Sequence, residues 1–141
     1  MTKITIADTG VIVASLNRRE QFHRWTIEQT RNLAPPFVTC EAVITEACYL
    51  LRDEIQDGAT QVIKLFGRNA LKIDFSSKDE MDSIQALMEK YQDVPMSFAD
   101  ACLVRMSELH DKSTVFTLDS DFWIYRKNGN EQIPLIIPDK I

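Results

Sequence analysis

The chain has 141 residues, of which 45% are hydrophobic, and its formal net charge is −5 at pH 7. This is the usual length of one domain, and we expect a single domain over residues 1–141 with a hydrophobic core that needs no disulfide bonds. The composition excludes general disorder, and the negative charge excludes a protein that grips nucleic acid mainly through a broad basic surface.

The first half of the chain alternates between short strand-like and longer helix-like segments. Apolar and β-branched runs predict strands, and apolar residues three or four positions apart predict helices. The expected elements are a strand at residues 4–7, a short buried helix at 10–16, a helix at 22–33, a brief strand at 37–39 and a strongly apolar helix at 40–52. Pro35 and Pro36 form the strongest break, which is too short to separate two domains.

The second half continues this alternation. Asp57 is expected to cap a helix that reaches residue 66, and Ser77 with Glu80 is expected to form a capping box for a helix that reaches residue 91. The other expected elements are a strand at 71–75, a helix at 97–110, a strand at 114–118 and an edge strand at 134–137. This order predicts an α/β fold with a central, mostly parallel sheet and helices on both faces.

Four acidic residues lie inside or directly beside apolar segments: Asp8, Glu46, Asp100 and Asp119. Burying an unpaired carboxylate is costly or forces it to bind a proton, so these placements suggest a positive partner. Asp8 and Asp119 each follow a predicted strand, and sites in parallel sheets lie outside the carboxyl ends of the strands. Asp100 opens a helix that starts from the same edge. We therefore expect the acids to gather around a divalent cation held by oxygen ligands.

Glu46 requires a separate argument, because it lies in the middle of a predicted helix. The residues three and four positions away are apolar: Ala42, Val43, Tyr49 and Leu50. We therefore expect Glu46 on the helix face that packs inward, where it can reach the other acids only if its helix crosses the edge of the sheet. Arg52 and Arg105 are conceivable structural partners for it.

The other three acids each have a purely structural alternative. Asp8 precedes a predicted helix and is a favourable N-cap, and Asp119 could cap the turn that begins at Ser120. Asp100 stands three residues after Ser97, which resembles a capping box. Four independent caps would not account for Glu46, and this favours a shared site.

The cysteines and the apolar runs bear on where the protein works. Cys40, Cys48 and Cys102 are odd in number and flanked by apolar residues, which predicts reduced thiols. The N-terminus lacks the apolar segment of a signal peptide, and no run approaches the roughly 18 residues of a membrane-spanning helix. We expect a soluble, cytoplasmic protein that makes no membrane contact. With His23 and His110 as its only histidines, the chain lacks the usual ligands of a zinc site.

The acidic motifs resemble those of a known family. The segments 6–10, 43–47, 96–101 and 117–122 appear in the order and setting of PIN-domain ribonucleases, and they are most similar to VapC-type toxins of bacterial toxin–antitoxin pairs. The resemblance covers essentially the whole chain. It implies a PIN-like three-layer sandwich and an endoribonuclease that depends on Mg2+ or Mn2+. It also implies an RNA substrate, a small antitoxin that blocks the active site, and a homodimer.

Carried over to this sequence, the family's acidic quartet falls on Asp8, Glu46, Asp100 and Asp119. The resemblance further implies that Thr117 supports the site through its hydroxyl and that Asp121 assists or replaces Asp119. Gly10 departs from the family pattern, which often has Ser or Asn there. We expect Asp8 and Asp100 to bind the ion directly and Glu46 and Asp119 to hold water or a second ion, so that an activated water attacks the phosphodiester.

Three other functions compete with this interpretation. The chain could be a non-catalytic PIN-fold binding or adaptor domain, or a nuclease of housekeeping RNA processing, because a fold does not fix a function. A phosphoryl-transfer enzyme using Asp8 as acceptor is disfavoured, because Gly10 stands where such enzymes have a second Asp and the chain has no glycine-rich phosphate loop. Trp123 and Tyr125 could anchor a partner, although packing in the core is the simpler expectation.

Overall fold

The computed structural model describes residues 3–139 and 141. Its helices and strands follow one another along the chain as β1 (Ile4–Ala7), α1 (Thr9–Leu16), α2 (His23–Thr30), β2 (Phe37–Thr39), α3 (Glu41–Leu51), α4 (Gly58–Gly67), β3 (Leu71–Ile73), η1 (Ser77–Glu80), α5 (Met81–Lys90), α6 (Phe98–Leu109), β4 (Ser113–Phe116), η2 (Ser120–Trp123), β5 (Arg126–Lys127), β6 (Glu131–Gln132) and β7 (Leu135–Ile136). Within the described part of the chain, no helix is long and apolar enough to cross a membrane.

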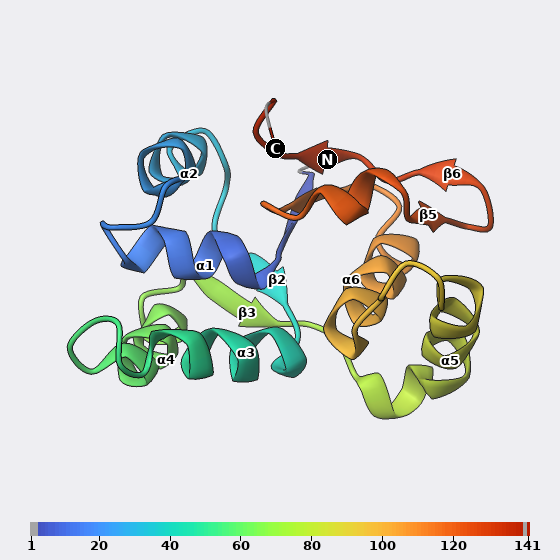
Figure 1. Ribbon diagram of the computed structural model, residues 1–141, viewed down its shortest axis with the longest axis horizontal. Coiled ribbons are helices and arrows are strands. Elements are labelled where there is room, and N and C mark those ends of the chain that lie inside the picture. Colours follow the sequence, from blue (N-terminus) through green and yellow to red (C-terminus); the bar gives the residue numbers. More distant parts are fainter. Residues whose placement is uncertain (1–2, 140) are drawn as a thin grey trace.

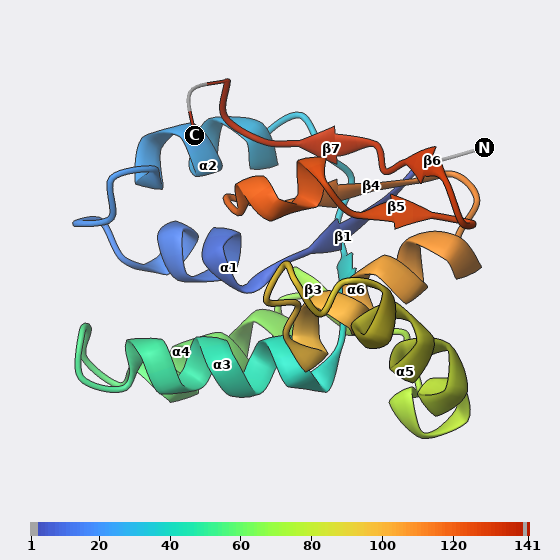
Figure 2. The same ribbon diagram turned by 45° about the vertical axis from the view of Figure 1, so that its right-hand side comes forward.

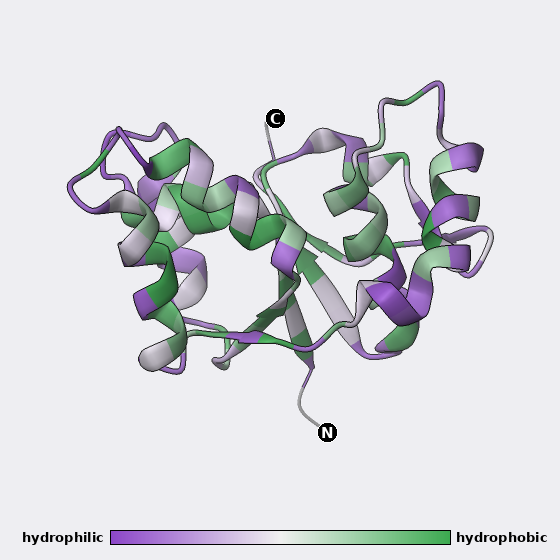
Figure 3. Cartoon of the chain, turned by 90° about the horizontal axis from the view of Figure 1, so that it is seen from below, coloured by the Kyte–Doolittle hydropathy of each residue, from purple (hydrophilic) through white to green (hydrophobic). Residues whose placement is uncertain are grey.

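The main sheet has five strands in the order β3-β2-β1-β4-β7, and every neighbouring pair is parallel. The central strand is β1, whose Ile6 pairs with Val38 of β2 on one side and with Val115 of β4 on the other. Figure 3 shows the sheet between two groups of helices, and Figure 1 identifies α1 to α4 as one group and α5 with α6 as the other. The predicted parallel α/β fold with helices on both faces is therefore confirmed.

Burial explains why β1, β4 and α6 form the centre of the molecule. Strand β4 is buried along its whole length, and α6 buries seven of its twelve residues. A helix that is apolar on most sides is covered on most sides, and α6 packs against β1, β4, α3 and α5 (Figure 2). The first turn of this enclosed helix carries Asp100, so the core fixes where that carboxylate lies.

Several local predictions were wrong. Ser77 and Glu80 form no capping box, because residues Ser77–Glu80 are a short 3-10 helix. Glu80 instead pairs with Arg105 of α6, at 3.1 Å between Oε2 and Nε. Asp57 stands at the N-cap of α4, but its backbone is left-handed and, in the described structure, its side chain caps nothing.

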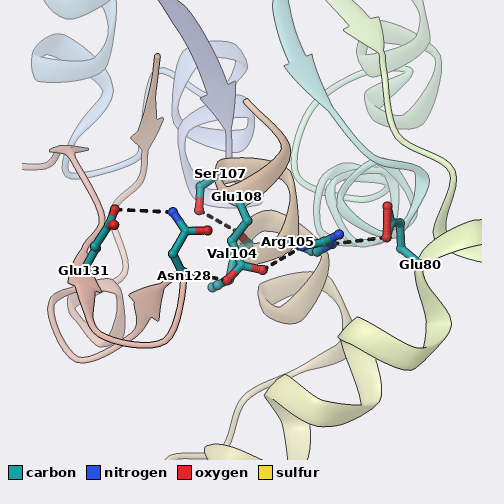
Figure 4. A network of polar contacts seen from close by, with 7 residues as sticks. All are labelled: Glu80, Val104, Arg105, Ser107, Glu108, Asn128 and Glu131. Atoms are coloured by element: carbon teal, nitrogen blue, oxygen red, sulfur yellow. Dashed lines mark hydrogen bonds and ion pairs between the residues drawn. The ribbon is translucent and has the colours of Figure 1, made fainter. Parts of the chain in front are cut away.

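The sequence reading also missed an antiparallel ribbon, in which β5 pairs with β6. The tight connection between the two strands is possible because Asn128 and Gly129 have φ values of 51° and 88°. Figure 4 shows how this turn is held: the backbone N–H of Asn128 donates to Glu108 of α6, and its side chain donates to Glu131.

Candidate functional site

An open pocket of about 560 Å³ lies where β1 and β4 end and α1 and α6 begin. Its lining includes all four acids predicted from the sequence, Asp8, Glu46, Asp100 and Asp119. The other lining residues are Thr9, Gly10, Leu50, Ser97, Leu118 and Ser120. The structure thus brings together four carboxylates that are up to 111 positions apart in the chain, from residue 8 to residue 119. We call this hollow the acidic pocket.

Asp8 is the most enclosed of the four acids, with 7% of its surface exposed. One carboxylate oxygen accepts a hydrogen bond from the backbone N–H of Thr9 at 2.7 Å, and the other accepts from the hydroxyl of Thr117 at 2.7 Å. Burial nevertheless raises the pKa of Asp8 to about 7. The two hydrogen bonds lower this pKa, and the negative charges of Asp100 and Asp119 raise it further. Asp8 does cap α1, as its structural alternative predicted, and it also lines the pocket.

Three hydrogen bonds hold Asp100 in place at the start of α6. Its backbone N–H donates to the hydroxyl of Ser97 at 3.0 Å, and its Oδ2 accepts from the backbone N–H of Ser97 at 3.4 Å, which completes the predicted capping box. The same Oδ2 accepts from the hydroxyl of Tyr125 at 3.1 Å. Partial burial raises the pKa of Asp100, and the charge of Asp119 adds to this effect.

Tyr125 is the residue of this site that sequence reasoning missed. Its side chain is fully buried, and its ring makes edge-on contacts with Tyr91 and Phe122. Burial and the negative charge of Asp100 both raise the pKa of its phenol, so the hydroxyl keeps its proton and remains a donor. The sequence predicts only a core or interface role for Tyr125, because no local spacing reports a contact across 25 positions.

One buried hydroxyl connects two of the acids. Thr117 is fully buried, and its Oγ1 donates to Asp8 and accepts from the backbone N–H of Asp119 at 2.9 Å. The supporting contact implied for Thr117 is therefore present. The carboxylate of Asp119 accepts from the backbone N–H of Asp121 at 2.9 Å and caps η2. Asp121 is outside the set of residues that lines the pocket.

The prediction for Glu46 was wrong in one respect. Glu46 is exposed rather than packed inward, because α3 buries the stripe Val43, Ala47 and Leu51 instead. Glu46 still lines the acidic pocket, and α3 begins directly after β2, at the edge where the parallel strands end. Neither suggested arginine is its partner among the described residues: Arg52 pairs with Asp53, and Arg105 pairs with Glu80 and Glu108.

The acidic pocket suits a small divalent cation that prefers oxygen. Its four ionisable lining residues are all carboxylic acids, and a cation beside Asp8 would offset the burial that raises its pKa. Within the described residues, no three His, Cys, Asp or Glu side chains stand close enough together to hold one ion between them. The described lining offers carboxylate oxygens, which hard divalent cations prefer, and holds neither His nor Cys, the usual ligands of zinc.

Comparison with known proteins agrees with the fold. A family model described as PIN domain matches residues 5–128, whereas no curated protein sequence matches the chain. The structure is similar to Mycobacterium tuberculosis VapC20, described as a toxin that cleaves the sarcin–ricin loop, with a TM-score of 0.74 and 16% identity over 83% of this chain and 91% of that one. It is also similar to VapBC2 of Rickettsia felis bound to promoter DNA, with a TM-score of 0.61 and 16% identity over 96% and 99% of the two chains.

Proposed function

Because the chain belongs to the PIN-domain family, we propose that it is a divalent-metal-dependent endoribonuclease and the toxin of a toxin–antitoxin pair. The observation that carries this proposal is the gathering of Asp8, Glu46, Asp100 and Asp119 in one pocket. The likeness to a toxin that cleaves the sarcin–ricin loop supports RNA as the substrate. The likeness to VapBC2, described as bound to a DNA fragment from its promoter, supports a small protein partner.

We assign Asp8 and Asp100 as the direct ligands of the ion, because these two acids combine partial or full burial with a raised pKa. Glu46, which is exposed, and Asp119, which caps η2, would orient water at the rim of the pocket. When bound, the ion supplies positive charge that neutralises the charge developing on the phosphodiester and makes a nearby water more acidic. Mg2+ and Mn2+ both satisfy this donor set.

The residues behind the acids hold them in place. Thr9 and Thr117 each donate to one oxygen of Asp8, so its carboxylate can reach an ion only through the remaining lone pairs of these oxygens. Tyr125 and Ser97 both donate to Oδ2 of Asp100, which leaves its Oδ1 for the pocket. Hydrogen bonds from supporting residues fix the orientation of metal ligands, and their loss typically costs 10- to 100-fold in affinity or activity. Thr117 and Tyr125 are therefore positioning residues.

The negative charge of the chain is compatible with an RNA substrate. The ionisable residues of the acidic pocket are carboxylic acids, so a phosphate would be repelled unless a cation lay between them. The protein would then bind the scissile phosphate through its ion rather than through a basic surface. The free thiols of Cys40, Cys48 and Cys102 favour a reducing compartment such as the cytoplasm.

Cleavage of single-stranded RNA by the purified protein, with Mg2+ or Mn2+ and with EDTA, tests this function. We expect cleavage with either ion and none in EDTA. Asp100→Asn should fold normally and lose at least about 100-fold in rate, because removing a direct ligand costs several kcal/mol and about 1.4 kcal/mol is a factor of ten. Asp93→Asn, which changes an exposed carboxylate outside the pocket, is the matched control. Undiminished cleavage by Asp100→Asn, or cleavage in EDTA, would contradict the proposal.

A further inference from the structure

A second pocket of about 580 Å³ adjoins the acidic pocket, and the two share Glu46 and Ser97. It lies between the first turn of α3, the first turn of α6 and the segment that follows β3. Figures 1 and 2 show the starts of α3 and α6 side by side. The remaining lining residues are Cys40, Glu41, Ala42, Thr45, Phe75, Ser77, Phe98, Ala99 and Cys102. We call it the aromatic pocket.

The walls of the aromatic pocket are largely apolar. Phe98 exposes 39% of its surface, and Phe75 is half-buried against the core. The buried Cys40 and Cys102 lie at its base. A volume of this size is typical of pockets that take small planar ligands, and an exposed aromatic ring beside such a pocket offers a stacking surface.

The charged groups of the aromatic pocket can only accept hydrogen bonds. Its charged lining residues are the exposed carboxylates Glu41 and Glu46, and among the described residues that line it none is cationic. The hydroxyl of Thr45 already donates to the backbone oxygen of Glu41 at 3.0 Å. A phosphate would face two negative charges here, whereas a flat group that carries N–H donors would find carboxylate acceptors.

We propose that the aromatic pocket receives the base of a nucleotide next to the scissile phosphate, with Phe98 as the stacking surface and Glu41 as a hydrogen-bond acceptor. This inference rests on the proposed ribonuclease function. It is based on the continuity of the two pockets, which share Glu46 and Ser97. A nucleotide next to a phosphate in the acidic pocket can therefore place its base beside Phe75 and Phe98. Single-stranded RNA is recognised in this way, by stacking on aromatic side chains and by hydrogen bonds to base edges.

The occupant's chemistry gives the pocket a preference among bases. Adenine, cytosine and guanine carry an exocyclic amine with two N–H donors for a carboxylate, whereas uracil offers only its ring N3–H, which lies between two carbonyl oxygens that a carboxylate repels. Cleavage should therefore be slower where uracil occupies the aromatic pocket. Glu41→Gln, which exchanges one acceptor oxygen for a donor, should weaken this discrimination against uracil several-fold.

The proposal is tested with a synthetic single-stranded oligoribonucleotide that is cut at one mapped bond. Two further versions each carry a single abasic residue, one on the 5′ side of that bond and the other on the 3′ side. We expect one abasic version to lower kcat/KM of the wild type about tenfold, because stacking on an aromatic residue contributes on the order of 1–3 kcal/mol per base. Phe98 also lines a hollow with Met81, Ile84 and Met88 of α5, so Phe98→Leu keeps an apolar side chain there but removes the aromatic face. It should lose about tenfold on the intact RNA and nothing further on that abasic RNA. Leu109→Ala, at the other end of α6 and 47% exposed, should behave like the wild type.

The possible outcomes separate this inference from the function on which it rests. If the wild type cleaves no RNA, the ribonuclease function fails and the base pocket fails with it. If the wild type cleaves RNA but Phe98→Leu loses the same factor on intact and abasic substrates, only the base pocket is overturned. Melting curves of each variant identify a loss caused by unfolding, and Glu41→Gln tests the pocket without altering any aromatic residue.

Discussion

Asp8 should destabilise the metal-free protein at alkaline pH, although it is proposed to bind the ion. Burial raises its pKa from 3.8 to about 7 in the folded chain. A group that binds its proton more tightly when folded favours folding at low pH. That contribution is complete below the unfolded pKa of 3.8 and is lost progressively as the pH rises to about 7. Above pH 7 the folded chain carries a buried, ionised Asp8.

The size of this effect follows from the pKa values. A difference of about three pKa units corresponds to about 4 kcal/mol of lost stability at pH 8. Asp8→Asn cannot ionise, but it replaces one of the two acceptor oxygens that bind Thr9 and Thr117, at a cost of about 1 kcal/mol. We therefore expect Asp8→Asn to be about 3 kcal/mol more stable than the wild type at pH 8, which is a rise in Tm of roughly 6–12 °C.

Differential scanning calorimetry in EDTA at pH 8 and pH 5 measures this difference. At pH 5 the advantage of Asp8→Asn should shrink to about 1 kcal/mol, because Asp8 is then protonated in the folded wild type. Asp93→Asn, at an exposed site, should match the wild type at both pH values. If Asp8→Asn is no more stable than the wild type at pH 8, Asp8 is not held in an unfavourable ionised state.

Three other outcomes follow from the same contacts. Mn2+ should raise the Tm of the wild type by more than that of Asp8→Asn and should release a proton on binding at pH 6, and equal Tm shifts in the two proteins would argue against a site at Asp8. Tyr125→Phe keeps the buried ring but loses the hydroxyl that donates to Asp100. The cleavage rate and the affinity for Mn2+, measured by calorimetry, should each fall about tenfold, and unchanged values would show that Tyr125 does not position Asp100. Arg105→Met breaks the ion pairs with Glu80 and Glu108 (Figure 4) and should lower the free energy of unfolding in urea by about 1–2 kcal/mol without slowing cleavage. An unchanged free energy of unfolding would show that these pairs do not stabilise the fold.

Much of the fold can be predicted from local sequence, because buried strands and helices show characteristic spacings of apolar residues. The segments around β1, β4 and α6 are apolar runs that end in an acid or begin with one, and the parallel sheet brings those ends to one edge. The convergence of Asp8, Asp100 and Asp119 could therefore be predicted before any contact was known. Capping was not an alternative to this role, since all three acids cap an element and line the pocket.

What could not be predicted depends on contacts between distant segments. Apolar neighbours placed Glu46 inside the core, but the packing of α3 against α1 and α4 selects a different stripe for burial. The hydroxyl of Tyr125 reaches Asp100 because β5 follows η2 back across α6, which no spacing reveals. Glu80 fits the pattern of a capping box, yet Arg105 offers it a stronger, charged partner.

The most direct test of the account is a crystal of the wild-type protein soaked in Mn2+, with anomalous diffraction used to locate the ion. The account predicts one strong peak in the acidic pocket, within coordination distance of carboxylate oxygens of Asp8 and Asp100. A fully occupied Mn2+ site elsewhere, with the acidic pocket empty at saturating ion, would contradict it.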